Sequence, residues 1–269
     1  MKTILTAALL LLAALPAAMS AFAMPAAAME VIAEPGGHQP TGGGEAPAGH
    51  CSPTPGLPAD HPPVDETLSA VRAAFAAGAD RVALDLQVAG GGAPVVSYGG
   101  ACGTARAATS LRELLTAFPD GRFLLDLKGG ARGAGQAMID YLKAAMGGGL
   151  VRAGQLLVYS SGDEAINSEA ASALPGVAAP GLVMQEAADC LAEYGQRGVF
   201  PRACQGTEIP LSIGALKNMG DYAADVMKAV HAIHARAHVL GVEDAEDYRF
   251  AAALEPDFIW TDRIDALGL

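Results

Sequence analysis

Two aspartates and one lysine are the residues of this sequence whose surroundings best suit chemistry. Asp85 lies in the apolar run "RVALDL" (81–86), and Asp126 and Lys128 lie in "RFLLDLKG" (122–129). A lone carboxylate inside an apolar strand is unfavourable unless it is paired or binds a metal. Alternation along a strand places Asp126 and Lys128 on the same side. The aspartates could hold a hard divalent cation beside one phosphate oxygen. A purely structural Asp–Lys pair is the competing interpretation.

Apolar stretches that alternate with helical patterns must position these residues. Such alternation is typical of a parallel sheet that is buried on both faces. Eight units in about 250 residues predict a (β/α)8 TIM barrel, α/β in class and folded as a single domain. An open doubly wound sheet is the alternative, but no G-x-G-x-x-G motif follows the first strand. The predicted strands lie near residues 30, 82, 123, 156, 182, 209, 238 and 257, the fifth covering residues 181–187.

The carboxyl ends of barrel strands are where this architecture carries its chemistry. Glu34, Asp85, Tyr98, Asp126 and Lys128 all lie at or near the ends of predicted strands. We therefore expect their side chains to share one mouth of the barrel.

Three histidines, His231, His234 and His238, are spaced like a metal-binding stripe. The first two are three residues apart on a predicted helix and share a face. His238 begins a predicted strand, which places it at the opposite, N-terminal end of the barrel. Because metal ligands must meet strict geometry, we expect no metal site here.

A segment rich in glycine and proline, residues 35–63, follows the first predicted strand. Its eight prolines and seven glycines exclude a regular helix or an interior strand, so a long loop is predicted. The loop contains His38, His50 and His61. These histidines either fold over the barrel mouth or remain solvated surface residues.

Residues 1–23 have the pattern of a secretory signal peptide. Lys2 precedes an apolar core, and small residues at Ala21 and Ala23 suit cleavage. A membrane anchor is the alternative, but the apolar run is alanine-rich and interrupted by a proline. We predict a secreted or periplasmic protein whose mature chain, residues 24–269, has no transmembrane segment.

The mature chain is strongly acidic. Without Lys2, it has 16 basic and 29 acidic residues, a net charge of −13. This charge opposes binding to the phosphate backbone of nucleic acids and to anionic lipid surfaces. Nucleic acid is therefore not an expected partner, although a few basic side chains suffice to contact one phosphate.

Several segments resemble the glycerophosphodiester phosphodiesterase family. Residues 65–100 resemble its signature region, which reads approximately P-E-N-T, a helix, G-A-D-x-x-E-L-D, a turn and P-V-V-x-H-D. Residues 238–267 resemble its last two β/α units, which end in T-D-R-P-D. The "DLK" sequence at 126–128 resembles the related sphingomyelinase D phospholipases. The likeness covers most of the mature chain, with a poor fit at 35–63 and about 188–220, and implies a TIM barrel.

The resemblance also implies that several catalytic positions have changed. Glu34 stands where the family has its first catalytic histidine, and Pro35 where it has the neighbouring arginine. Ala83 stands where the family has the metal-binding glutamate of E-L-D. Tyr98 and Gly99 stand where it has the second catalytic histidine and an aspartate.

Asp85, Asp126 and Lys128 are the positions that match the family. In that family two histidines act as general base and acid while a divalent ion neutralises the phosphate. Each proton transfer contributes about 10²–10⁴-fold to the rate. Glu34 could serve as a base if its pKa were raised, but tyrosine, with a reference pKa of about 10, is poorly suited to shuttle protons near neutral pH.

The leading hypothesis is an exported, catalytically degenerate member of this superfamily. It would bind a phosphodiester, a phospholipid head group or a partner at the barrel mouth, with Mg²⁺ or Ca²⁺ bound weakly or not at all. The alternative is an active metal-dependent phosphodiesterase that uses His38, His50 or His61. A third hypothesis is a structural envelope protein without a ligand.

Four cysteines, Cys51, Cys102, Cys190 and Cys204, predict two disulfides in an oxidising compartment, and three pairings are open. We predict the pairs Cys51–Cys102 and Cys190–Cys204. The first would join the Gly/Pro-rich loop to the loop after Tyr98, both at the barrel mouth, and the second would close a short loop. No C-x-x-C motif is present, so a thiolate zinc site is not expected.

Overall fold

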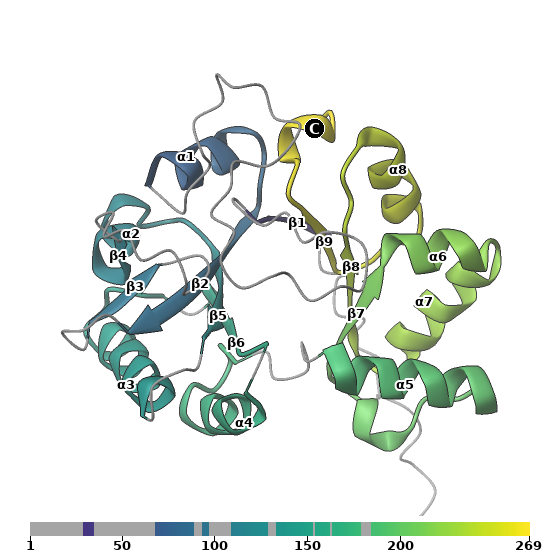
Figure 1. Cartoon of the computed structure of the whole chain (residues 1–269), viewed down its shortest axis with the longest axis horizontal. Coiled ribbons are helices and arrows are strands. Elements are labelled where there is room, and N and C mark those ends of the chain that lie inside the picture. The colour runs from purple at the N-terminus through teal and green to yellow at the C-terminus, as the bar shows by residue number, and fades with distance from the viewer. Residues whose placement is uncertain are drawn as a thin grey trace, which may run out of the picture.

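The fold is a (β/α)8 barrel in one domain, in which parallel strands curve around a central axis and helices lie outside them (Figure 1). In this computed structural model the described residues are 29–34, 68–88, 93–96, 109–128, 133–152, 154–161, 163–178 and 184–269. Within them, no helix is long and apolar enough to cross a bilayer.

The sheet places the first strand between the second and the last. Strand β1 pairs in parallel with β2 on one side and with β9 on the other, and β5 and β6 continue beyond β2. Strands β8 and β7 continue beyond β9. The parallel strands are β1 (Glu30–Ala33), β2 (Arg81–Val88), β5 (Phe123–Leu127), β6 (Leu156–Tyr159), β7 (Glu208–Ser212), β8 (Arg236–Leu240) and β9 (Phe258–Thr261). Two short strands, β3 (Pro94–Val96) and β4 (Thr109–Ser110), add an antiparallel extension to β2.

The helices cover the outer face of the strands (Figure 1). They are α1 (Leu68–Ala76), α2 (Leu111–Ala117), α3 (Ala134–Gly147), α4 (Glu164–Ala173), α5 (Met184–Arg197), α6 (Ile213–Met219), α7 (Tyr222–Ala232) and α8 (Ala245–Ala253). Two short 3₁₀ helices span Arg202–Cys204 and Ile264–Ala266.

Side-chain caps fix where four of these helices begin, among them α6, where Ser212 Oγ accepts from the backbone N–H of Ala215. Ser110 and Glu113 form a reciprocal capping box at the start of α2. Asp163 accepts hydrogen bonds from two backbone amides at the start of α4, and Asp244 does the same for α8. Because α4 and α8 follow the carboxyl ends of β6 and β8, these caps also fix the turns that leave the barrel mouth.

The predicted strand over residues 181–187 is wrong in its second half. Met184 begins helix α5, whose Leu191 and Tyr194, three residues apart, pack onto the outer core. The short apolar run before residue 185 is compatible with a strand, but the apolar residues that follow recur at helical spacing, and the segment forms a helix. A parallel bridge between Val158 and Ala178 lies just before this point.

Apolar side chains fill the middle of the barrel, while two further clusters lie between the strands and the helices. The interior cluster comprises the buried residues Ile32, Ala83, Leu124, Leu157, Phe258 and Trp260. Since side chains alternate along a strand, residues two positions further along also face the interior. This alternation directs Glu34, Asp85 and Asp126 into the barrel at its carboxyl end.

The opposite, N-terminal end is closed by ion pairs. Arg81 Nε lies 3.2 Å from Glu30 Oε2, and Arg122 Nη2 lies 2.6 Å from Glu30 Oε1. Arg81 Nη1 also donates to the carbonyl oxygens of Phe123, at 3.0 Å, and Gln155, at 3.3 Å. Burial lowers the pKa of Arg81 to about 10, so the guanidinium stays charged at neutral pH.

Candidate functional site

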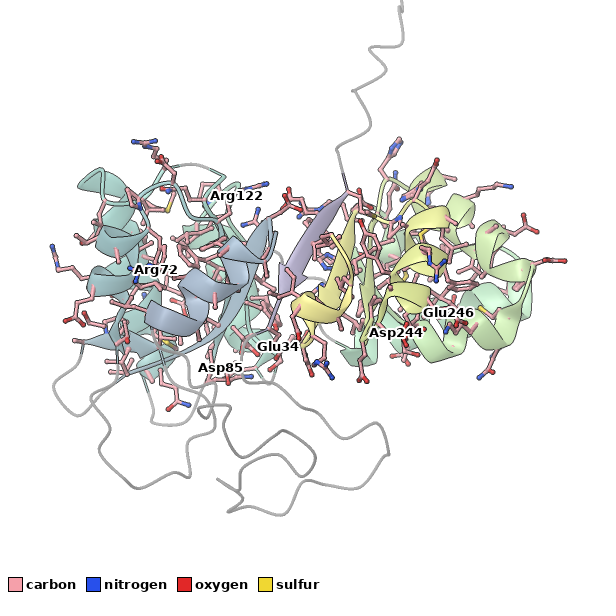
Figure 2. The ribbon with its side chains drawn as sticks, turned by 90° about the horizontal axis from the view of Figure 1, so that it is seen from above. Glu34, Arg72, Asp85, Arg122, Asp244 and Glu246 are labelled. Atoms are coloured by element: carbon pink, nitrogen blue, oxygen red, sulfur yellow. A yellow bond between two sulfur atoms is a disulfide. The ribbon has the colours of Figure 1, made fainter. Side chains whose placement is uncertain are left out.

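The candidate site is a cluster of carboxylates and one lysine at the carboxyl end of the strands. Asp85 of β2 and Asp126 of β5 are direct partners in the parallel register, and Glu34 follows β1. Figure 2 shows Glu34 and Asp85 at the same end of the barrel, with Arg122 at the opposite end. The structure therefore brings together the described residues that the strand-end rule selects, whereas Tyr98 lies outside the described part of the chain.

Lys128 is the centre of this cluster. Its Nζ lies 3.2 Å from Asp85 Oδ1 and 2.5 Å from Asp126 Oδ2, and it donates to Ser161 Oγ at 3.2 Å. An ammonium has three N–H donors, so each has an acceptor here. Burial disfavours the charged form, but the charges and hydrogen bonds of Asp126 and Asp85 outweigh it and raise the pKa of Lys128. The lysine is thus a fixed positive charge.

Asp126 is held by the neighbouring strand as well as by the lysine. The backbone N–H of Ser161 donates to Asp126 Oδ1 at 2.9 Å, and the hydroxyl of Tyr159 also bonds to this carboxylate. Burial, followed by the charge of Asp126, raises the pKa of Tyr159, which keeps its hydroxyl a neutral donor. Only 6% of the Asp126 side chain is exposed, so its orientation is set by these contacts.

A buried pair positions the turn that carries Ser161. Ser160 Oγ donates to the carbonyl of Leu127 at 2.7 Å. The amide of Asn167 accepts from Ser160 N and donates to Ser160 O, each at 2.7 Å. These bonds tie β5, the end of β6 and helix α4 together beneath the site.

Neither Tyr159 nor Asn167 is among the residues that the sequence pattern selects for the site. Tyr159 could have been found by alternation, because it lies two residues beyond the interior Leu157 and opposite Asp126 in the register. Asn167 lies on a helix, and its contact with Ser160 depends on how α4 returns to the sheet. No local pattern predicts that contact.

Glu34 has the electrostatics of a group that exchanges protons near neutral pH. Burial raises its pKa from 4.5 to about 7, helped by the negative charges of Asp262 and Asp85 and opposed by Lys128. Such a carboxyl can donate or accept a proton under physiological conditions.

The resemblance implies a divalent cation at this site, which would need several charged oxygen ligands. Ala83, at the position of the expected glutamate ligand, is buried in the barrel interior and offers only a methyl group. Among the residues that the structure describes, no three carboxylates, histidines or cysteines lie close enough to hold a metal ion. Asp85 and Asp126 are bridged by the Lys128 ammonium instead. The described residues do not fit a Mg²⁺ or Ca²⁺ site.

Several predicted features fall outside the described residues. They are the signal peptide (1–23), the loop histidines His38, His50 and His61, the substituted positions Pro35, Tyr98 and Gly99, and the pair Cys51–Cys102. The second predicted disulfide is confirmed. Cys190 of α5 is bonded to Cys204, with 6.1 Å between their Cα atoms.

The histidine stripe is not brought together. His231 Nε2 lies 3.3 Å from Asp257 Oδ2 at the surface, and His234 occupies the turn after α7 with a positive φ of 57°. His238 is the middle residue of β8, not its first, and its side chain is fully buried. The predicted strand started two residues too late, because β8 begins at Arg236.

His238 belongs to a hydrogen-bonded set inside the barrel. Trp260 Nε1 donates to His238 Nδ1 at 2.9 Å, and His238 Nε2 lies 2.6 Å from Glu208 Oε2. An indole N–H can only donate, so Nδ1 carries no proton and Nε2–H donates to Glu208. Burial lowers the pKa of His238, consistent with a neutral ring of structural function.

Comparisons with known proteins show the fold. No family model matches the sequence, and no curated protein sequence matches it. A glycerophosphoryl diester phosphodiesterase domain of a Mycobacterium tuberculosis protein aligns with a TM-score of 0.61 at 16% identity, covering 88% of this chain and 97% of that chain. An Agrobacterium tumefaciens glycerophosphodiester phosphodiesterase aligns with a TM-score of 0.56 at 16% identity, covering 89% and 97%.

A third structure is similar in the same way. It is an Oleispira antarctica phosphodiesterase in complex with the product sn-glycerol-3-phosphate, with a TM-score of 0.56 at 13% identity, covering 88% of this chain and 94% of that chain. The chain therefore has the fold of glycerophosphodiester phosphodiesterases, as the sequence resemblance implied.

Proposed function

We propose that this chain is an exported protein that uses the phosphodiesterase barrel to bind an amine-bearing phosphodiester, such as a phospholipid head group, without the ordinary two-histidine hydrolysis. The observation that carries the proposal is the mouth cluster itself. One ammonium, that of Lys128, faces Asp85 and Asp126 beside the partly ionised Glu34.

Charge balance supports a zwitterionic ligand. Carboxylates outnumber the lysine at the described mouth, and Asp262 adds another negative charge close to Glu34. A purely anionic phosphate would be attracted by Lys128 and repelled by its neighbours. A phosphodiester with its own ammonium would place the phosphate at Lys128 and the ammonium toward Glu34 and Asp262.

The site residues support binding more than turnover. Glu34 can take part in one proton transfer, but Ala83 supplies no ligand to a cation that would neutralise the phosphate. Tyr98, at the second acid–base position of the resemblance, has a reference pKa of about 10. Losing one proton transfer lowers a rate by about 10²–10⁴-fold.

Calorimetric titration of the mature protein tests the proposal. We expect saturable binding of glycerophosphocholine and glycerophosphoethanolamine, weaker binding of glycerol 3-phosphate, and no release of choline or ethanolamine. Replacing Lys128→Met should weaken diester binding by about 10–100-fold, the effect of losing a charge-assisted hydrogen bond. The matched control is Lys143→Met on the exposed face of α3, which should bind as the wild type does.

Two results would overturn this function. Metal-dependent hydrolysis of either diester that is abolished by Asp85→Ala would establish an active phosphodiesterase. This is the alternative in which the loop histidines supply the acid–base groups. Failure of the folded wild-type protein to bind any of these compounds would favour a structural protein.

A further inference from the structure

We infer that the Lys128 ammonium takes the place of a divalent cation at this mouth, so that the site functions without Mg²⁺ or Ca²⁺. The inference deepens the proposed function, on which it rests for the role of the mouth. It is tested with the metal alone, so that the two proposals can fail separately.

The position of the ammonium is the first support. Lys128 Nζ lies between two strands, within 3.2 Å of Asp85 Oδ1 and 2.5 Å of Asp126 Oδ2. Those aspartates are paired in the β2–β5 register, so the space between their carboxylates is set by the sheet. A hard cation prefers about six or more oxygen ligands at about 2.0–2.6 Å. It would have to displace the ammonium and then lie beside its charge.

The bonds around Asp126 are the second support. Its Oδ1 accepts from the backbone N–H of Ser161, and its Oδ2 is paired with Lys128. The hydroxyl of Tyr159 bonds to the same carboxylate. Both oxygens therefore have donors already, and Ser161 Oγ accepts the remaining lysine proton at 3.2 Å. This shell is organised around a protonated amine.

The third support is Ala83, which stands at the position of the expected glutamate ligand. The side chain of Ala83 faces the same interior two residues before Asp85, and it is 5% exposed among apolar neighbours. Without the lysine, two carboxylates could hold a dication only weakly, since affinity for hard cations rises with the number of charged ligands. Among the described residues, no third carboxylate, histidine or cysteine lies close enough to join them as a ligand. An internal lysine neutralises the same two aspartates without that requirement.

Titration of the mature protein with MgCl₂ and with CaCl₂, at constant ionic strength and without phosphodiester, tests the inference. Weak extracellular calcium sites have dissociation constants of about 10⁻⁴–10⁻³ M, so titration to about 10 mM covers that range. We expect the wild type to show no saturable heat and no thermal shift. Lys128→Met should gain saturable binding, which the further change Asp126→Asn should remove. Lys143→Met should behave as the wild type.

Wild-type binding at submillimolar Mg²⁺ or Ca²⁺ that Asp126→Asn abolishes would overturn the inference, and this measurement needs no lysine variant. A folded Lys128→Met protein that gains no cation affinity would also overturn it. If the wild type binds metal and glycerophosphocholine, this inference fails and the proposed function stands. If it binds neither, the proposed function fails and the absence of a cation site stands.

Discussion

At both ends of this barrel alternate side chains point inward, but a buried glutamate has a lowered pKa at the N-terminal end and a raised pKa at the mouth. At the N-terminal end, Glu30 is paired with two arginines, and Glu208 is paired with Arg236 and hydrogen-bonded to His238. Burial alone would oppose ionisation of Glu208, but its bonds to His238 and the charge of Arg236 lower its pKa.

At the mouth, carboxylates outnumber the positively charged side chains that pair with them. Lys128 serves two aspartates, and the pKa of Glu34 is raised to about 7 by burial and by neighbouring negative charge. At the N-terminal end Glu30 and Glu208 each have arginine partners, which stabilise the fold, whereas the excess of carboxylates at the mouth leaves one of them able to exchange protons. The comparison shows how one barrel separates a structural end from a chemical end.

The largest expected effect comes from breaking the structural end at Arg81. Only 3% of its side chain is exposed, and it holds Glu30 and the carbonyls of Phe123 and Gln155. Arg81→Met should lower the free energy of unfolding by about 3–5 kcal/mol, as for a broken buried ion pair. Urea denaturation measures this loss.

The control for Arg81 is a surface arginine at the same end. Arg152 is 73% exposed and paired with Asp120. Arg152→Met should change stability by less than about 1 kcal/mol. Equal losses in the two variants would contradict the structural difference between a buried and an exposed pair.

The next largest effect is the pH dependence of stability that Glu34 at the mouth should cause. Glu34 has a folded pKa of about 7 against 4.5 in the unfolded chain, so its contribution to stability is present below pH 4.5 and is lost as the pH rises to 7. The stability of the wild type relative to Glu34→Gln should therefore fall by about 3 kcal/mol over that interval. Denaturation at a series of pH values measures it.

The matched change for Glu34 is Glu169→Gln, an exposed carboxylate on α4. The free energy of unfolding of that variant should change with pH in the same way as that of the wild type between pH 4.5 and 7. A parallel curve for Glu34→Gln as well would show that the carboxyl at the mouth is not perturbed, and the contrast between the ends would disappear.

A smaller effect is expected inside the barrel. Trp260→Phe keeps an aromatic ring but removes the donor to His238 Nδ1, which should lower stability by about 1–3 kcal/mol. Burial, which lowers the pKa of His238, is retained in this variant, so the ring should stay neutral at pH 7. Imidazole nitrogen resonances followed by NMR report which ring nitrogen carries the proton, and a proton on Nδ1 of the wild type would contradict the assigned tautomer.

Much of this organisation could be predicted from local pattern. The strand around Asp126 was identified by its apolar run, and period-two alternation placed Lys128 beside it, as the structure shows. The Ser110–Glu113 capping box also follows a local pattern, because a Ser-x-x-Glu sequence ahead of an apolar run predicts a helix start and depends only on neighbours in sequence.

The features that sequence could not predict depend on partners distant in the chain. The direct pairing of Asp85 with Asp126 requires the register of two strands, and the tautomer of His238 is set by Trp260 on the neighbouring strand. The predicted strand at 181–187 was wrong because a short apolar run does not distinguish a strand from the start of a helix.

The position of β1 has a consequence for how the chain must fold. This four-residue strand is the first element of the described chain, yet Glu30 pairs with Phe258 of the last strand. Contacts between such distant residues form late and slow the folding of a domain. A chain that is synthesised from its N-terminus must therefore leave one edge of β1 unpaired until β9 has emerged. We expect the barrel to close at the contact between β1 and β9, and only after β9 has been synthesised.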